Sequence, residues 1–181
     1  TARPTRPLPT PRPTTSAPTA TPAPPPAPTE IDLLTGPRAG YCFDECVLYD
    51  EVGGGRAELV NGATCVPGTG LEFDGVSDYA EIAPVEIGDQ STFAVWVRVD
   101  SLDGYQYIFD FGDGSADDSI ELFVDSGGGL SWWIYVGSSI EVVTAFDVVE
   151  EGQWMHTVGT VEGSTMKLYI NGLQVVQNEE A

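Results

Sequence analysis

The feature that most constrains this chain is the concentration of proline at its N-terminal end. Of the 14 prolines, 11 lie within residues 1–29, a stretch with no acidic residue, no glycine and no aromatic residue. Proline fixes φ and pushes the residue before it into extended conformations. We therefore expect an extended, polyproline-II-like stalk of about 90 Å, at about 3.1 Å per residue. The composition changes sharply at Glu30, which predicts a stalk over residues 1–29 and a folded domain over residues 30–181.

The stalk consists mainly of Pro, Thr, Ser and Ala, a composition typical of O-glycosylated extracellular spacers. It also resembles the proline-rich tracts of hydroxyproline-rich matrix glycoproteins. The chain holds no Asn-x-Ser/Thr sequon, so any glycan is expected to be O-linked. The candidate glycan-bearing residues are Thr14, Thr15, Ser16, Thr19, Thr21, Pro22, Pro24, Pro25 and Pro26. A bare interdomain linker carrying a Pro-x-x-Pro ligand is the alternative; the glycosylated stalk predicts a secreted protein of the matrix or of a cell-surface appendage.

The charge of the chain limits its partners. There are 28 Asp and Glu residues against 7 Lys and Arg, a net charge of -21. Nucleic acid is excluded as a partner, because phosphate binding needs a basic surface, and polyanionic glycans are disfavoured by repulsion. No apolar run is long enough to span a membrane. Neutral glycans and other copies of the chain remain, and the stalk's Arg3, Arg6 and Arg12 offer cations for a neighbour's acidic surface.

Residues 31–181 show the pattern of an all-β domain, with short β-branched and aromatic runs separated by Gly, Asp, Asn and Ser. Expected strands are residues 92–99, 107–111, 120–124, 130–136, 140–146, 154–161, 166–170 and 173–176. Asn171-Gly172 supplies the two positive-φ residues of a type I′ turn, which predicts a tight hairpin. Strands at this spacing favour an antiparallel two-sheet sandwich or jelly roll.

Four motifs carry a family resemblance. Residues 71–82 (LEFDGVSDYAEI) resemble an FDG-x-x-DY-x-x-I signature, and residues 93–99, 152–158 and 162–172 match later strands in order. From about Gly40 to Val176 the chain is similar to laminin G-like, concanavalin A-like jelly rolls. The resemblance implies that sandwich fold, with residues 40–45 as its first strand and residues 59–64 as an early one. Asp74 and Asp78 of the signature are expected to cap turns. The resemblance specifies fold and not function.

Members of this family normally continue beyond the Asn-Gly hairpin with strands that close the sheets, whereas this sequence ends at Ala181. We therefore expect a sandwich that lacks its closing strands and exposes an edge. Ile31, Leu33 and Leu34 form a short apolar segment that suits a donor strand from a neighbouring copy. Truncation and an unusual local closure are the alternatives.

The cysteines and one acidic loop are the candidate cross-links and metal ligands. Cys42, Cys46 and Cys65 predict one disulfide, joining Cys65 to Cys42 or Cys46, and one spare thiol. The family resemblance implies calcium at a rim of the domain. Hard oxygen ligands crowd one glycine-containing loop, at Asp110, Asp113, Asp117 and Asp118. A solvated acidic loop without metal is the alternative, and no cofactor is expected to be required.

The remaining site prediction concerns Trp132-Trp133. Neighbouring residues of a strand face opposite ways, so Trp132 is expected in the core, whereas Trp133 and Tyr135 are expected on the surface as a platform for a sugar or a protein. The one histidine, His156, is expected to be structural, and the paired-carboxylate strand motif of sandwich glycosidases is absent. An enzyme is therefore not expected.

Together these features predict an extracellular structural or adhesive glycoprotein segment. It would assemble into, or decorate, a matrix, a surface appendage or a fibril without catalysis. The alternative function is a calcium-dependent glycan-binding module on a glycosylated stalk.

Overall fold

The computed structural model describes residues 39–88, 90–112 and 118–179 of the 181-residue chain. The predicted stalk, the donor-strand candidates Ile31, Leu33 and Leu34, and the loop residues Asp113 and Asp117 lie outside these ranges. Within them the chain forms strands, turns and loops without a helix, so the all-β prediction is confirmed. No helix in this part of the chain is long and apolar enough to cross a membrane.

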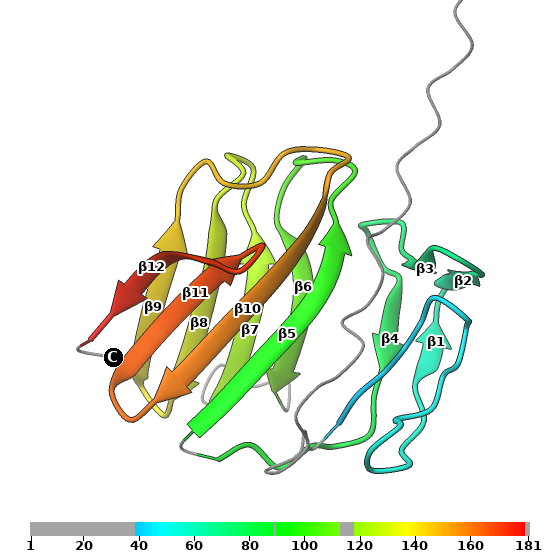
Figure 1. Ribbon diagram of the computed structural model, residues 1–181, viewed down its shortest axis with the longest axis horizontal. Helices are drawn as coiled ribbons and strands as arrows, with labels where there is room; N and C mark the ends of the chain where they lie inside the picture. Colours follow the sequence, from blue (N-terminus) through cyan, green and yellow to red (C-terminus); the bar gives the residue numbers. More distant parts are fainter. Residues whose placement is uncertain (1–38, 89, 113–117, 180–181) are drawn as a thin grey trace, which may run out of the picture.

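Two four-stranded antiparallel sheets form the main body of the molecule (Figure 1). The first has the order β12-β11-β10-β5, and the second has the order β6-β7-β8-β9. The strands of the first sheet are β5 (Gln90–Arg98), β10 (Trp154–Glu162), β11 (Thr165–Ile170) and β12 (Leu173–Asn178). Those of the second are β6 (Gln106–Gly112), β7 (Asp118–Val124), β8 (Leu130–Val136) and β9 (Ser139–Ala145).

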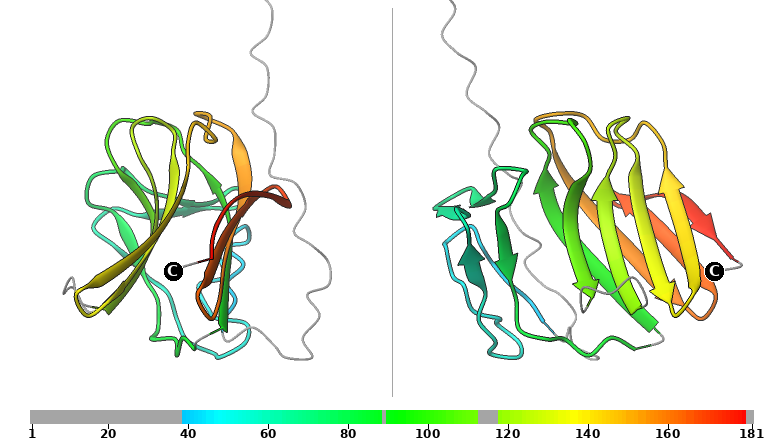
Figure 2. Two further views of the ribbon diagram at one scale, coloured as in Figure 1. Left: turned by 90° about the vertical axis from the view of Figure 1, so that its left-hand side faces the viewer. Right: turned by 180° about the vertical axis from the view of Figure 1, so that it is seen from behind.

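The two sheets face each other across one hydrophobic core, as the edge-on view in Figure 2 shows. Leu122, Val124 and Leu130 of the second sheet are buried against Met155, Met166 and Leu168 of the first. Trp132 is only 1% exposed and packs edge-on against Phe93 of the facing sheet. The prediction that Trp132 belongs to the core, and the two-sheet sandwich itself, are therefore confirmed.

The hairpin between β11 and β12 forms as predicted. Asn171 has a φ of 50° and Gly172 a φ of 81°, the pair of left-handed residues that a type I′ turn needs. The backbone N–H of Asn171 donates to the carbonyl of His156, and its side-chain Oδ1 accepts from the N–H of His156. The turn is thus also tied to the neighbouring strand β10.

Residues 39–88 form a smaller N-terminal lobe beside the β5 and β6 side of the sandwich (Figures 1 and 2). It contains two short antiparallel pairs, β1 with β4 and β2 with β3. Their bounds are β1 (Glu58–Val60), β2 (Thr64–Val66), β3 (Gly70–Glu72) and β4 (Tyr79–Glu81).

Two strand expectations in this lobe are wrong. Residues 40–45 form no strand; residues 43–46 are a turn, closed by the N–H of Cys46 donating to the carbonyl of Phe43. Residues 59–64 do not form one strand, because Asn61 adopts a φ of 64° and starts a turn between β1 and β2. A residue in the left-handed region breaks the extended geometry that a strand requires.

Asp74 caps its turn, as the family signature predicts. Its Oδ1 accepts hydrogen bonds from the backbone N–H groups of Val76, Ser77 and Asp78 at 2.8–3.0 Å. The side chain of Asp78 in turn accepts a hydrogen bond from the backbone N–H of Asp74. Because these bonds favour the charged carboxylate, they hold the pKa of Asp74 below its ordinary value.

The sandwich has strands β12, β5, β6 and β9 at its sheet edges. At one side β12 is tied to β9 by the Asn178 side chain, which donates to the carbonyl of Val142 at 3.5 Å. Within the described ranges no further strand pairs with these edges. Completion by a neighbour's strand stays a prediction, because the proposed donor segment lies outside the described residues.

Candidate functional site

A row of aromatic side chains follows the face of the β6–β9 sheet that is turned away from the core. We call this surface the outer face and define it by Tyr105, Tyr107, Asp110, Glu121, Phe123, Trp133 and Tyr135. Phe123 lies at the centre of the row, with ring centroids 5.5 Å from Tyr105, 5.3 Å from Tyr107 and 5.1 Å from Trp133. Trp133 continues the row to Tyr135 at 6.1 Å.

Alternation along β7 and β8 places most of these residues. Glu121 and Phe123 alternate with the core residues Leu122 and Val124, and Trp133 lies directly opposite Glu121. The sequence signal in β7 is the same alternation that identified Trp133 and Tyr135, so Glu121 and Phe123 were within reach of sequence reasoning.

Tyr107 reaches the outer face for a different reason. The pairing of β6 with β7 shifts between Tyr107 and Phe109, so Tyr107 lies opposite Phe123 while Phe109 lies opposite the core residue Leu122. Regular alternation would have placed Tyr107 on the same side as Phe109. A β-bulge changes which side chains share a face, and the sequence carries no clear signal for it here.

The exposure of the row differs from the prediction. Trp133 and Tyr135 were expected to be exposed, but both are half-buried, because Trp133 packs edge-on against Phe123. Phe123 is only 3% exposed, whereas Tyr105 and Tyr107 are 66% and 59% exposed. The most accessible rings of the surface are therefore two tyrosines that the sequence prediction omitted.

A pair of carboxylates interrupts this aromatic surface. Asp110 of β6 lies directly opposite Glu121 of β7. Burial and the nearby charge of Asp110 raise the pKa of Glu121, although the Ser119 hydroxyl, 3.4 Å from Glu121 Oε1, partly offsets the shift. Burial and the same two carboxylates also raise the pKa values of Tyr107 and Tyr135. The two carboxylates and the two tyrosine hydroxyls therefore share one electrostatic environment.

The described cations lie elsewhere. Arg56 belongs to the N-terminal lobe, and Arg98 and Lys167 belong to the other sheet. Arg98 is bound by Asp100 at 2.6 Å and lies over the ring of Trp154. No arginine or lysine of the described part of β6–β9 therefore neutralises Asp110 and Glu121.

The calcium ligands predicted from the sequence do not form a group in the described structure. Asp110 shares a face with Glu121, whereas Asp118 alternates with it along β7 and so faces the other way. Asp113 and Asp117 lie outside the described residues. No group of three or more His, Cys, Asp or Glu side chains within residues 39–88, 90–112 and 118–179 is arranged to hold a metal ion. Calcium binding stays a prediction.

His156 lies on the outer side of the other sheet. Its ring packs against Trp96 with centroids 5.0 Å apart, and its backbone bonds to Asn171. This packing agrees with the structural role expected for the residue. The absence of catalysis stays a prediction.

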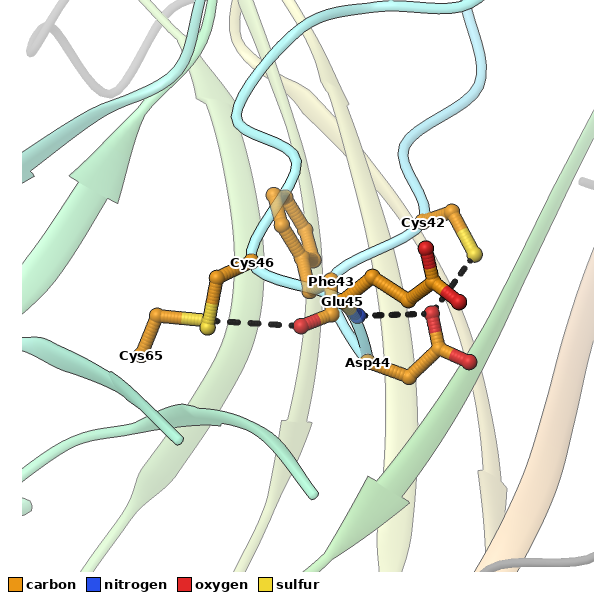
Figure 3. Close-up of a disulfide and its surroundings, with 6 residues drawn as sticks. All are labelled: Cys42, Phe43, Asp44, Glu45, Cys46 and Cys65. Carbon is orange, nitrogen blue, oxygen red and sulfur yellow. Dashed lines mark hydrogen bonds between the residues drawn. A yellow bond between two sulfur atoms is a disulfide. The ribbon is translucent and has the colours of Figure 1, made fainter. Parts of the chain in front are cut away.

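A disulfide joins Cys46 to Cys65 and leaves Cys42 as a thiol (Figure 3). This settles the two alternatives that the spacing left open. The Cys42 thiol donates to Asp44 Oδ1 at 2.8 Å. That hydrogen bond, together with burial and the charges of Asp44 and Glu51, raises the pKa of Cys42 to about 11.

We expect Cys42 to react slowly with alkylating reagents. The thiolate is the nucleophile, and the pKa of about 11 replaces a reference value of 9.0. At pH 8 the thiolate fraction of Cys42, and with it the rate of reaction with iodoacetamide, should be about 100-fold lower than for a thiol with the reference pKa. Mass-spectrometric alkylation kinetics measure this rate. Asp44→Asn should restore fast alkylation, while Glu45→Gln, which removes a charge but no hydrogen bond to the thiol, should not; fast reaction of the unaltered protein would contradict the assignment.

A family model and two solved structures are similar to this chain. A family model described as the concanavalin A-like lectin/glucanases superfamily matches residues 74–180. A search of curated proteins finds no match. Among solved structures, an S-layer domain-containing protein (residues 221–444) from Clostridium thermocellum is 31% identical, with 78% of this chain and 71% of that chain covered and a TM-score of 0.47.

A second similar structure is the CBM40 of the Ruminococcus gnavus IT-sialidase bound to alpha2,3 sialyllactose. It is 15% identical, with 50% of this chain covered and a TM-score of 0.44. The match spans about half, 53%, of that protein's length. The resemblance predicted from the sequence motifs is confirmed by the family match, which covers more than half of the chain. This protein is a laminin G-like member of the concanavalin A-like lectin/glucanases superfamily.

Proposed function

We propose that the folded part of this chain is a non-catalytic module of the cell surface or extracellular matrix that binds neutral glycans on the outer face. The observation that carries the proposal is the aromatic row beside Asp110 and Glu121 on a sheet face. The site thus extends the Trp133 and Tyr135 platform predicted from the sequence to Tyr105 and Tyr107.

The rings suit the apolar faces of sugars. Tyr and Trp combine a large apolar surface with a polar group, which favours them where a ligand is apolar on one side and wet on the other. Tyr105 and Tyr107 are both more than half exposed. They therefore offer stacking surfaces without rearrangement of the sheet.

The carboxylates supply polar recognition. Asp110 and Glu121 are acceptors for sugar hydroxyls, and a few such groups among apolar rings orient a ligand. Their charge, and the net charge of -21 on the whole chain, oppose sulfated or carboxylated glycans. Neutral glycans are therefore the class that this surface favours.

The wider arrangement supports an extracellular location. The disulfide is typical of an oxidising compartment. We propose that residues 1–29 form an O-glycosylated stalk that holds the domain of residues 30–181 away from its attachment point. Glycan binding at the end of such a stalk would serve adhesion, or the attachment of the protein to a matrix.

A neutral-glycan array probed with the full chain tests this function. Tyr107→Ala should lower glycan affinity by about twofold to tenfold, since a stacked aromatic ring contributes roughly 0.5–1.5 kcal/mol. Tyr79→Ala is the matched control, because Tyr79 is 48% exposed but lies in the N-terminal lobe. The same array with EDTA separates calcium-dependent from calcium-independent binding, and an assay of released sugar tests for hydrolysis.

Two outcomes would reject the proposal. One is that the folded protein retains no neutral glycan. The other is that Tyr79→Ala weakens retention as much as Tyr107→Ala does. Release of sugar that is lost in Glu121→Gln would replace the binding function with an enzymatic one.

A further inference from the structure

The lysines and arginines of the described residues lie away from the outer face, which carries the acidic pair Asp110 and Glu121. On the outer face, Glu121 lies opposite both Asp110 and Trp133, and within the described residues its hydrogen-bond partner is the Ser119 hydroxyl. No described lysine or arginine belongs to β6–β9. A ligand that brings a guanidinium would therefore gain an ion pair without displacing one of the protein's own.

The chain itself contains a segment of matching chemistry. Residues 1–13 carry Arg3, Arg6 and Arg12 and contain no acidic residue. A polyproline-II helix has three residues per turn, so in that conformation these three arginines would project from one edge. Pro4, Pro7 and Pro13 fall on the adjacent edge by the same count. The segment thus combines a cationic edge with a proline edge.

The dimensions of the two surfaces also agree. One turn of polyproline II advances about 9.3 Å, at about 3.1 Å per residue. Strands β6 and β8 are two strand spacings apart, about 9.6 Å at roughly 4.8 Å each. Measured across the strands, Tyr107 on β6 and Trp133 on β8 are therefore about one turn apart, with Phe123 of β7 between the two rings and Glu121 of β7 directly opposite Trp133. Aromatic-lined surfaces are the usual receptors for proline-rich helices.

We propose that residues 1–13 of one copy dock as a polyproline-II helix across strands β6, β7 and β8 of a second copy. The arginine edge faces Asp110 and Glu121, and the proline edge lies on Tyr107 and Trp133. The proposal concerns the same face as glycan binding but does not depend on a glycan being bound there.

The length of the intervening chain favours a second copy as the receptor. Residues 14–38 separate this segment from the described domain, and an extended proline-rich stretch of that length spans about 78 Å. A domain of about 140 residues is only about 37 Å across. In the extended conformation expected for it, this stretch would carry residues 1–13 past their own domain. Because its donor and receptor surfaces differ, the contact is head-to-tail, and repeated copies would form a chain of molecules.

Fluorescence anisotropy with a labelled peptide of residues 1–13 tests the contact at about 0.15 M ionic strength. The receptor is the full chain carrying Arg3→Gln, Arg6→Gln and Arg12→Gln, so that its own tract does not compete. A second peptide has the same composition, with the arginines moved off the three-residue repeat. We expect saturable binding of the native peptide, and binding of the shifted peptide weaker by about fivefold or more.

Two receptor variants locate the binding surface. Glu121→Gln should weaken binding about fivefold or more, whereas Glu162→Gln, the same charge change on β10, should stay within about twofold. Equal binding of the two peptides, or equal losses in the two variants, would show general attraction to an acidic protein and overturn the proposal, as would a lack of saturation. Glycan retention by the same receptor is measured separately, so either function can fail alone.

Discussion

Replacing Gly159 with alanine is expected to destabilise the sandwich by about 3 kcal/mol or more. Gly159 lies in the middle of β10, between Phe93 of β5 and Leu168 of β11. A Cβ built at this position would lie 1.0 Å from Cζ3 of Trp132. The indole ring therefore occupies the space that any other side chain would need, and Trp132 cannot retreat because it is buried between the sheets.

Urea denaturation followed by circular dichroism measures this cost. Gly88→Ala is the control, because no atom lies within 4 Å of the Cβ it would add; its effect should remain within about 0.5 kcal/mol. In a Trp132→Leu background the added methyl should cost much less, since the smaller side chain leaves room for it. An equal cost of Gly159→Ala in both backgrounds would show that the ring contact is not the cause.

Loss of the disulfide is expected to open the N-terminal lobe. Cys46 and Cys65 are separated by 19 residues, and closing a loop of that size stabilises the folded state by about 3 kcal/mol. The lobe has little else to replace this contribution, because Ala57 is the one fully buried hydrophobic residue among its described residues. The sandwich has its own core and should remain folded.

Hydrogen exchange resolved along the chain tests this local effect. In Cys65→Ser, amides of residues 39–88 should exchange faster, while those of β7, β8 and β10 should keep their protection. Cys42→Ser is the matched control, because Cys42 forms no disulfide. Faster exchange across the whole chain in Cys65→Ser would show that lobe and sandwich unfold together, contrary to this expectation.

Most of the sandwich could be predicted from the sequence because its signals are local. Alternation in residues 92–99 and the Asn171-Gly172 pair each depend on neighbouring residues, and both structures form as expected. The lobe was harder to predict. Residues 40–45 look like a strand in sequence, but their conformation is set by a turn at Phe43 and by the disulfide at Cys46.

The candidate site was only partly predictable, because it depends on register between strands. Trp133 and Tyr135 follow from alternation in one strand. The pairing of Asp110 with Glu121 requires knowledge of how β6 aligns with β7. Tyr107 depends in addition on a bulge within that alignment, since a shift of one residue reverses the face on which a side chain lies.

The position of the disulfide determines how the molecule would respond to a pulling force. In the sequence the N-terminal lobe lies between the proline-rich tract and the sandwich, so tension applied through the tract loads the lobe first. Once its short strand pairs separate, the Cys46–Cys65 bond still holds back the 19-residue interval between the cysteines. At about 3.5 Å per residue, the bond withholds about 65 Å of extension. The lobe would therefore extend only part of its full length while the bond is intact, and reduction of that one bond would release the withheld extension.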